Sequence, residues 1–292
     1  MKRVVFWLYS SILWLMALLP LWMLHIKARL LFFLIYYVFR YRRKITFENL
    51  QNSFPEKSLQ ERKKIARQYY QNLADLIVEF IKIKHISRKS INKHVFIKNP
   101  ELLSELFRQG KSVFIAIGHC GNWEWLGKKL ALNAEHRLFA VVKPLSDPYF
   151  NRYMNDLRVR FHAPNLIEFK KTYRTLLKNR ESLNAVFIAA DQTPTRSEIN
   201  FWTTFLNQET PFFKGIEKMS KALDYAVLYI DIQRVRRGYY AIEIIPVCME
   251  ASKTEPNQIT EKYVSLLEQS IRRHPDNWLW SHRRWKHKKE IN

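Results

Sequence analysis

Hydrophobic and polar positions divide the chain into an apolar N-terminal stretch and a longer part in which short apolar runs recur. Residues 4–24 carry no charged side chain, and a helix of roughly 20 apolar residues is long enough to cross the hydrocarbon layer of a bilayer. Residues 30–39 form a shorter apolar stretch between cations, a pattern typical of a helix that lies at the headgroups. The pattern predicts one transmembrane helix, kinked late in its course at Pro20, and an interfacial segment within residues 1–44.

The following segment, from about Ser58 to Ile83, has the apolar period of an amphipathic helix. Ser58 and Glu61 have the spacing of a capping box, which places the start of the helix at Ser58.

Beyond Pro100, short apolar runs alternate with helical patterns. The runs expected as buried strands are 113–117, 138–142, 185–190, 226–230 and 240–245. The expected helices are 123–132, 149–160, 172–179, 213–223 and 259–272. This alternation favours an α/β fold, with a layered, mainly parallel mixed sheet flanked by helices. We therefore expect an α/β domain over residues 45–292, behind the N-terminal anchor.

The charge of the chain is strongly positive, with 49 Lys and Arg against 26 Asp and Glu and a formal net charge of +23. Such an excess favours an anionic partner, and charge alone does not choose among nucleic acid, an anionic membrane, a phosphorylated lipid and an acidic protein. Cations are more numerous after the apolar stretch than before it, which predicts that the large domain lies on the cytoplasmic side. A cleaved signal peptide is the alternative, but the apolar core is long for one and no small-x-small cleavage site follows it.

Chemistry is expected where the apolar run 113–117 ends, in the segment GHCGNWE at residues 118–124. Ligands of α/β sheets bind beyond the carboxyl ends of the strands. Gly118 and Gly121 allow a tight turn around His119, and backbone N–H groups near the start of the following helix are suited to an oxyanion.

Two polar residues of this segment have expected roles around the histidine. Asn122 is a favourable N-cap, which places Glu124 in the first helical turn. We expect the carboxylate of Glu124 to bond one imidazole nitrogen of His119 and to leave the other as a general base for a hydroxyl nucleophile. The competing interpretation is a histidine that only stabilises the turn.

The segment GHCGNWE resembles the Gly-His-x-Gly-Asn-Trp-Glu form of the His-x-x-x-x-Asp/Glu motif. Through it the chain resembles the bacterial lipid A biosynthesis late acyltransferase family. Further matches follow in the family's order, at the segment 143–148, at two arginines, at an Asp-Gln step and at the closing segment WSHRRWK, residues 280–286. A block at 205–215 matches weakly, since Asn207 and Lys214 stand where the family has a glycine and a small hydroxylic residue.

The resemblance implies that His119 is the general base and Glu124 its partner. The residues expected to bind substrate are Asn122, Lys143, Arg158, Arg160, Asp191, Gln192, Arg283 and Arg284. Gly118 and Gly121 are expected to shape the turn or the oxyanion site. Cys120 occupies a variable position of the motif and is expected to be a spectator.

The resemblance also implies an activity. The expected reaction moves a fatty acyl chain from acyl carrier protein, an acidic partner, to a hydroxyl of a lipid A precursor at the cell inner membrane, with no nucleic acid involved. No cofactor or metal is expected, because the histidines and the two cysteines lack metal-site spacing. The alternatives are acyl transfer to another membrane lipid, such as an aminolipid or glycosylated phospholipid, and a non-catalytic basic binding module tethered to the membrane.

Overall fold

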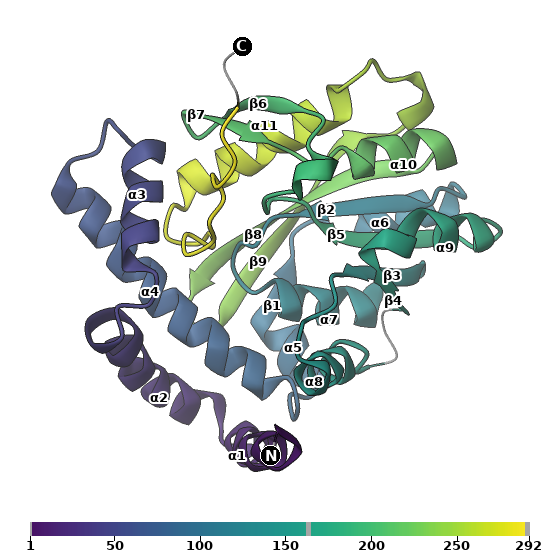
Figure 1. Cartoon of the computed structure of the whole chain (residues 1–292). Coiled ribbons are helices and arrows are strands. Elements are labelled where there is room, and N and C mark those ends of the chain that lie inside the picture. The colour runs from purple at the N-terminus through teal and green to yellow at the C-terminus, as the bar shows by residue number, and fades with distance from the viewer. Residues whose placement is uncertain (1, 162–164, 290–292) are drawn as a thin grey trace.

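The centre of the molecule is a mixed sheet of seven strands in the order β1-β9-β8-β2-β5-β3-β4 (Figure 1). The structure is a computed structural model, and it describes residues 2–161 and 165–289. β8, β2, β5, β3 and β4 run parallel to one another, β9 is antiparallel to β8, and β1 is parallel to β9. The strands of this sheet are β1 (Val95–Ile97), β2 (Val113–Ile117), β3 (Arg137–Val142), β4 (Asn165–Glu168), β5 (Asn184–Ala189), β8 (Ala226–Arg236) and β9 (Tyr239–Cys248). A small separate hairpin consists of β6 (Trp202–Phe205) and β7 (Gln208–Pro211).

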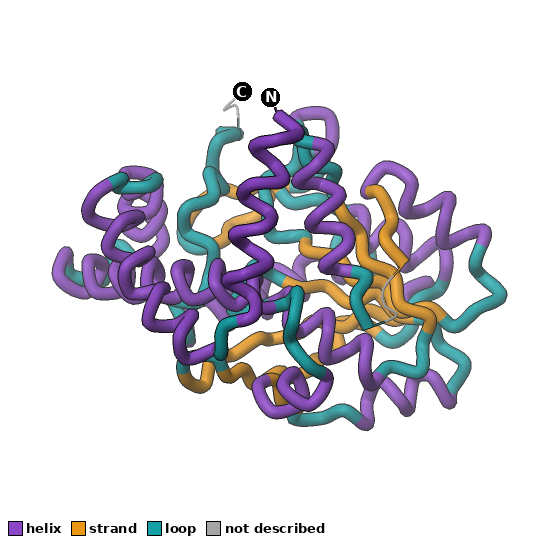
Figure 2. The backbone as a smooth tube through the Cα atoms, turned by 90° about the horizontal axis from the view of Figure 1, so that it is seen from below, coloured by secondary structure: helices purple, strands orange, loops and turns teal. Residues whose placement is uncertain are grey.

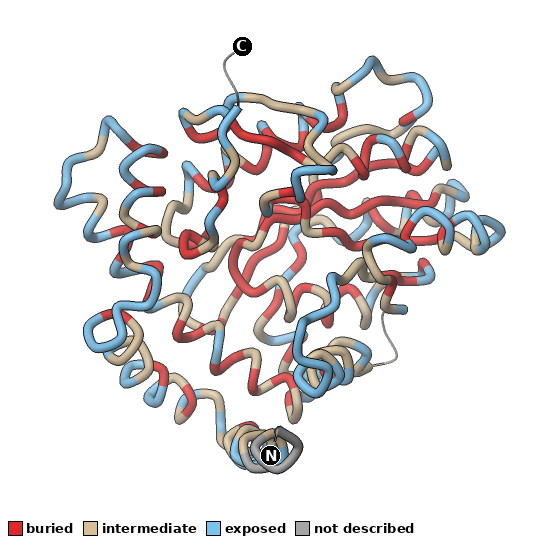
Figure 3. Tube along the Cα trace, viewed as in Figure 1, coloured by how far each residue is buried: buried red, intermediate tan, exposed pale blue. Residues whose placement is uncertain are grey.

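Helices cover both faces of the sheet, and buried residues concentrate along its central strands (Figure 3). The helices are α1 (Lys2–Leu18), α2 (Leu21–Phe33) with its π-helical continuation η1 (Leu34–Val38), α3 (Arg43–Ser53), α4 (Leu59–Lys82), α5 (Arg88–His94), α6 (Glu101–Arg108), α7 (Trp123–Asn133), α8 (Pro148–Arg158), α9 (Thr172–Lys178), α10 (Gly215–Leu223) and α11 (Gln258–Arg273).

The side chains of β2 show how one strand serves two apolar layers. Phe114 and Ala116 belong to the cluster that includes residues of α10 and α11. Val113, Ile115 and Ile117 belong to the cluster that includes α7. All five are buried, as a continuous apolar run predicts for a parallel strand covered on both faces.

The predicted α/β fold with a mainly parallel sheet is confirmed. All five expected strands and all five expected helices beyond residue 100 are present, most with ends shifted by one or two residues. The hairpin strands β8 and β9 continue past their apolar runs because their outer halves pair with each other. β1, β4, β6 and β7 escaped prediction because each has only three or four residues.

The apolar N-terminal stretch is two helices, so the kink expected at Pro20 in a single helix over residues 4–24 is a complete break. Pro20 separates α1 from α2, since proline has no N–H to continue the first helix and favours the start of the next. Leu21–Val38 is the stretch, among the residues described, that is long and apolar enough to cross a membrane. α2 packs along α4, while α1 contacts α4 and α8, so both helices lie against the body of the molecule (Figure 2).

The amphipathic helix expected from about Ser58 is confirmed as α4. The backbone N–H of Glu61 donates to Ser58 Oγ at 3.3 Å, and Ser58 N–H donates to the Glu61 carboxylate at 2.7 Å. This reciprocal capping box fixes the start of a 24-residue helix that joins the N-terminal helices to the sheet domain.

Candidate active site

The candidate site lies where β2 and β5 end side by side. These parallel strands pair in register, with Ile117 opposite Ala189. His119 and Asp191 each follow two residues later, so the register brings them together at the carboxyl edge of the sheet. This edge is where α/β folds place their ligand sites.

Asp191 is the carboxylate that orients the histidine. Its Oδ1 lies 2.6 Å from His119 Nδ1, and its Oδ2 accepts hydrogen bonds from the backbone N–H of His119 and from Trp278 Nε1, both at 2.8 Å. The side chain of Asp191 is only 2% exposed, against 18% for His119. Three donors thus hold a buried carboxylate in one position, from which it fixes the imidazole.

The electrostatics of this pair stabilise the protonated imidazole, and the hydrogen bond to Asp191 places the proton of the neutral form on Nδ1. Burial opposes charge on the imidazole, but the charge and hydrogen bond of Asp191 outweigh it, so the pKa of His119 is raised. Burial likewise opposes an ionised Asp191, yet His119 and the N–H donors lower the pKa of this carboxyl to about 2. An ionised Asp191 accepts a hydrogen bond from Nδ1–H, which leaves the Nε2 lone pair of the neutral imidazole free to accept a proton.

Glu124 bonds to an arginine, so the expectation that it orients His119 is wrong. Its Oε1 accepts hydrogen bonds from Arg158 NH2 at 2.8 Å and from Arg158 Nε at 3.1 Å. The negative charge of Glu124 still acts on the imidazole and contributes to the raised pKa of His119. The orienting role belongs to Asp191, which was expected to bind substrate.

The two glycines shape the turn around the histidine. Gly121 has φ of +52°, a left-handed conformation that L side chains rarely adopt. Its N–H donates to the carbonyl of Asn277 at 3.0 Å, so this group forms part of the turn and is not free for an oxyanion. At Gly118 a Cβ atom would lie 2.5 Å from Leu267 Cδ1, because the strand end packs tightly on α11.

Asn122 is a structural residue, which corrects the expectation that it binds substrate. It is 4% exposed, and its Oδ1 accepts from the N–H of Trp125 at 2.9 Å, the expected N-cap of α7. Its Nδ2 donates to Glu79 Oε2 at 2.8 Å. Glu79 also accepts from Tyr240 OH at 2.7 Å and lies 3.1 Å from His25 Nε2 of α2. The fully buried Glu79 therefore connects the turn that carries His119 to the N-terminal helices.

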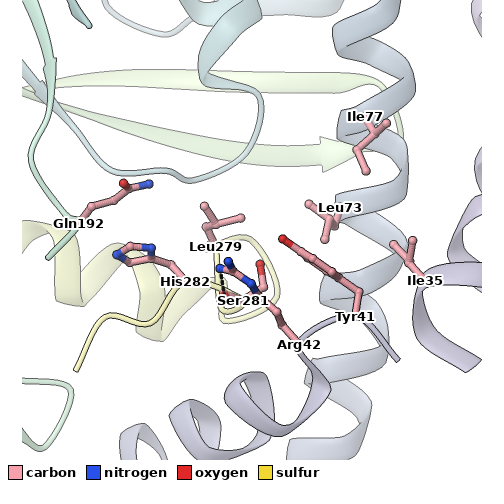
Figure 4. Close-up of a pocket in the computed structure, with 9 residues that line it drawn as sticks. All are labelled: Ile35, Tyr41, Arg42, Leu73, Ile77, Gln192, Leu279, Ser281 and His282. Carbon is pink, nitrogen blue, oxygen red and sulfur yellow. Dashed lines mark hydrogen bonds between the residues drawn. The ribbon is translucent and has the colours of Figure 1, made fainter. Parts of the chain in front are cut away.

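An apolar cavity of about 470 Å³ lies on the far side of Gln192 from His119, between η1, α4 and the C-terminal segment (Figure 4). Its lining consists of Ile35, Tyr41, Arg42, Leu73, Ile77, Gln192, Leu279, Ser281 and His282. Gln192 connects it to the site, because its Nε2 lies 3.3 Å from His119 Nε2. With the imidazole proton on Nδ1, the amide of Gln192 donates to the Nε2 lone pair.

The closing segment supplies buried support around the site. Arg284 is fully buried, donates to the carbonyl of Pro211 at 2.7 Å and stacks on Phe212, so the expectation that it contacts substrate phosphate is wrong. Burial lowers the pKa of Arg284 to about 10. Arg283 is exposed and stays available to a ligand. Burial also lowers the pKa of His282 to about 4, which keeps this cavity residue neutral at pH 7.

Lys143 and Arg160 differ in how far a ligand could reach them. Lys143 is exposed just beyond the end of β3, whereas Arg160 is partly buried and donates to the carbonyl of Ile83. This contact fastens the chain just after α8 to the end of α4, and substrate binding by Arg160 stays a prediction. The nearby thiol of Cys120 is buried, and burial raises its pKa, so it is no thiolate nucleophile at neutral pH.

Three residues of the site escaped the sequence prediction in their roles: Asp191 as orienting carboxylate, Glu79 and Trp278. A usable signal was that His119 and Asp191 each follow closely after an expected strand, because neighbouring parallel strands place such residues side by side. Glu79 carried a weaker signal, an acid among the apolar positions of a predicted helix.

Comparison with known proteins gives one family to which the chain is similar. The family model described as "Bacterial lipid A biosynthesis acyltransferase" matches residues 1–287. The chain is 23% identical over 248 residues to the lipid A biosynthesis palmitoleoyltransferase of Escherichia coli K12, with 84% of this chain and 79% of the relative covered. It has the same identity and coverage with the lipid A biosynthesis acyltransferase of Shigella flexneri.

Proposed function

The chain belongs to the bacterial lipid A biosynthesis acyltransferase family, and we propose that it transfers a fatty acyl chain from acyl carrier protein to a hydroxyl of a lipid A precursor at the inner membrane. The observation that carries this proposal is the His119–Asp191 pair, whose Nε2 is separated by Gln192 from an apolar cavity. A base close to a lipid-sized apolar space is what deprotonation of a lipid hydroxyl requires.

The proposed reaction begins at His119 Nε2. The acceptor hydroxyl replaces the amide of Gln192 at this nitrogen, gives up its proton to it, and its oxygen attacks the thioester carbonyl. The tetrahedral oxyanion collapses with cleavage of the C–S bond, and the departing sulfur takes the proton from the imidazolium. An ester and a free thiol result, and the base returns to its neutral form. Ionised Asp191 stabilises the imidazolium between the two proton transfers.

Two polar side chains can donate hydrogen bonds to oxygens that gain negative charge in this reaction. Gln192 keeps an N–H donor at the base, close to where the acceptor oxygen must enter. Arg158 is held by Glu124 at the edge of the site, and its guanidinium has further donors for a phosphate or a thioester oxygen. We assign Arg158, Gln192, Lys143 and Arg283 to substrate binding, and Glu124 to the positioning of Arg158.

The cavity beside Gln192 is the proposed site for an acyl chain. Ile35, Leu73, Ile77 and Leu279 give it an apolar lining, which matches the chemistry of a hydrocarbon chain. Arg42 stands at the same cavity and donates to the carbonyl of Ser281 at 3.1 Å, so a cation borders the apolar space.

The test is transfer of a labelled acyl group from acyl carrier protein to a lipid A precursor by the purified full-length protein. His119→Ala is expected to abolish product formation while its thermal unfolding stays like that of the unaltered protein. Unchanged turnover by this variant would contradict the mechanism. Product formed only with a non-saccharide lipid acceptor would retain the acyl transfer and overturn the lipid A acceptor.

A further inference from the structure

Neither N-terminal helix is well suited to cross a bilayer alone. α1 has 17 residues, so it extends over roughly 25 Å, against the roughly 30 Å of a hydrocarbon core. α2 with η1 is long enough, but Lys27 and Arg29 lie near the middle of the stretch Leu21–Val38. A helix that spans would place both exposed cations near the centre of the bilayer, where charge is most costly.

Both helices are also fixed to the sheet domain by polar contacts. Lys82 of α4 donates to the carbonyls of Ala17 at 2.9 Å and Leu19 at 2.7 Å, at the end of α1. In α2, His25 lies 3.1 Å from Glu79, and its carbonyl accepts from Arg237 NH2 at 2.6 Å.

Aromatic contacts continue this attachment along α1. Phe6 lies 5.4 Å from Tyr149 of α8, and Trp14 lies 5.5 Å from His85, measured between ring centroids. If α1 crossed the bilayer, it would either lose its contact with α8 or place α8 in the hydrocarbon layer.

Large apolar residues are nevertheless exposed along both helices. On α2 the exposed residues Trp22, Ile26, Leu30 and Phe33 recur at helical spacing, with exposed fractions of 51–64%. The face that points inward is buried at Leu24 and Ala28. On α1 the exposed large apolar residues are Trp7, Ile12, Trp14, Leu15 and Leu18.

Cations border this surface, which identifies its occupant. Lys27 and Arg29 are exposed on α2, and Arg40 and Lys44 are exposed just after η1. An apolar face with Trp residues and a border of Lys and Arg matches the interface of a bilayer that contains anionic lipids.

We propose that α1, α2 and η1 lie in the plane of the membrane and enter one leaflet of an anionic bilayer, with the start of α1 on the same side as the sheet domain. The attachment is monotopic in place of the single pass that the sequence predicts. Ile35 of η1 lines the cavity beside Gln192, so this arrangement sets the cavity at the level of the leaflet. The topology does not depend on the proposed acyl transfer.

The topology is tested with a cysteine-bearing peptide fused before Met1 in one protein and after Asn292 in another, both with Cys248→Ser. Sealed inner-membrane vesicles of known orientation are treated with a membrane-impermeant maleimide. Both tags are expected to react from the same side, and both to be protected in vesicles of the opposite orientation. Reaction of the two tags from opposite sides would establish a single pass and overturn the proposal.

A third protein separates in-plane helices from a hairpin of two spans. It carries Leu18→Cys, near the turn between α1 and α2, where the side chain is 50% exposed. An in-plane arrangement keeps this cysteine unreactive from the side opposite the sheet domain. Labelling from that side would show that the turn crosses the bilayer, which overturns the proposal.

A matched pair of substitutions tests the apolar surface itself. Leu30→Glu changes a residue that is 63% exposed on α2, and Phe96→Glu changes one that is 64% exposed on β1. With vesicles of phosphatidylethanolamine and phosphatidylglycerol, Leu30→Glu is expected to weaken binding by roughly tenfold or more, because one buried Leu is lost from the lipid. Phe96→Glu is expected to bind normally. Equal binding by both variants would overturn the role of this face.

Discussion

Two carboxylates lie close to His119, and their surroundings give them different roles. Asp191 is buried, bonded by three donors and bonded to the imidazole itself. Glu124 is partly exposed and bonded to Arg158. A carboxylate can hold the imidazole tautomer only through direct contact, so the first acts on the base and the second on a cation beside it.

Replacement of Asp191 by Asn should lower turnover about 10³- to 10⁴-fold, since an amide at this place no longer fixes the Nδ1–H tautomer or stabilises the imidazolium. The measurement is single-turnover acyl transfer, with thermal unfolding as the control for folding. A loss of less than about tenfold would show that another group orients His119.

The pH dependence of the same pair has a definite sign. The base works as neutral imidazole, so kcat/KM should rise with pH through the raised pKa of His119, above the ordinary value of 6.5. Asp191→Asn removes the negative charge that raises the pKa of His119. The rise of kcat/KM with pH should therefore occur at lower pH in this variant, although its maximal rate falls. If kcat/KM of the variant rose over the same pH range as that of the unaltered protein, a group other than His119 would control the rate.

The pair of Glu124 and Arg158 is expected to act as one unit. Glu124→Gln and Arg158→Gln should each lower kcat/KM about tenfold or more, because each removes a charge-assisted pair of hydrogen bonds. The double variant should fall little below the lower single variant. Independent, multiplicative losses in this double-mutant cycle would contradict the proposed positioning of Arg158 by Glu124.

At the scale of elements, the site depends on how α4 and α7 meet. The start of α7 is fixed through Asn122, whose amide bonds both the N–H of Trp125 and the carboxylate of Glu79 on α4. Trp125 Nε1 in turn donates to the carbonyl of Glu79 at 3.1 Å. The turn that carries His119 is thus held from a neighbouring helix as well as from its own strand.

Asn122→Ala should therefore destabilise the protein by about 2–4 kcal/mol, of which about 1 comes from the lost N-cap and the rest from a buried carboxylate that lacks one donor. Thermal unfolding in detergent measures this change. Asn133→Ala, at the exposed end of the same helix, is the control and should change stability by less than about 0.5 kcal/mol. Equal effects of the two substitutions would refute the structural role of Asn122.

The sequence predicted elements well where one local signal dominated. The run Val113–Ile117 was predicted to the residue as β2, and Ser58 and Glu61 marked the start of α4. Prediction was incomplete where a break interrupts a uniform pattern, as at Pro20, because periodicity alone does not distinguish one kinked apolar helix from two helices. It failed for the short strand β4, which exists only through pairing with β3.

The site was predicted in its location and only partly in its contacts. His119 was found from the turn that follows β2, since that signal is local. The partner Asp191 is 72 residues away, and its role depends on strand order and register, which no local pattern contains. The buried position of Arg284 has a similar cause, because it results from packing of the closing segment on Pro211 and Phe212.

At the scale of the whole molecule, acidic side chains are buried more often than basic ones. Among the residues described, five acids are buried, namely Asp75, Glu79, Asp191, Glu217 and Asp231, whereas the buried residues of the Lys and Arg type are Lys128 and Arg284. Asp75, for example, is bonded by Arg234 and Arg237. The outer surface is therefore even more basic than the net charge of +23 indicates, and long-range attraction of an acidic protein or an anionic membrane follows from it.

This surface predicts a strong salt dependence for an acidic acyl donor. With acyl carrier protein as donor, kcat/KM should fall about tenfold or more between about 0.05 M and 0.5 M NaCl, because screening removes the attraction that brings the two proteins together. Acyl-pantetheine, which offers the same thioester without charge, should lose little activity over this range. Initial rates at fixed detergent and acceptor concentration measure both dependences. Equal salt sensitivity for the two donors would place the charge effect at the acceptor or the membrane and would contradict a role of the basic surface in the recruitment of acyl carrier protein.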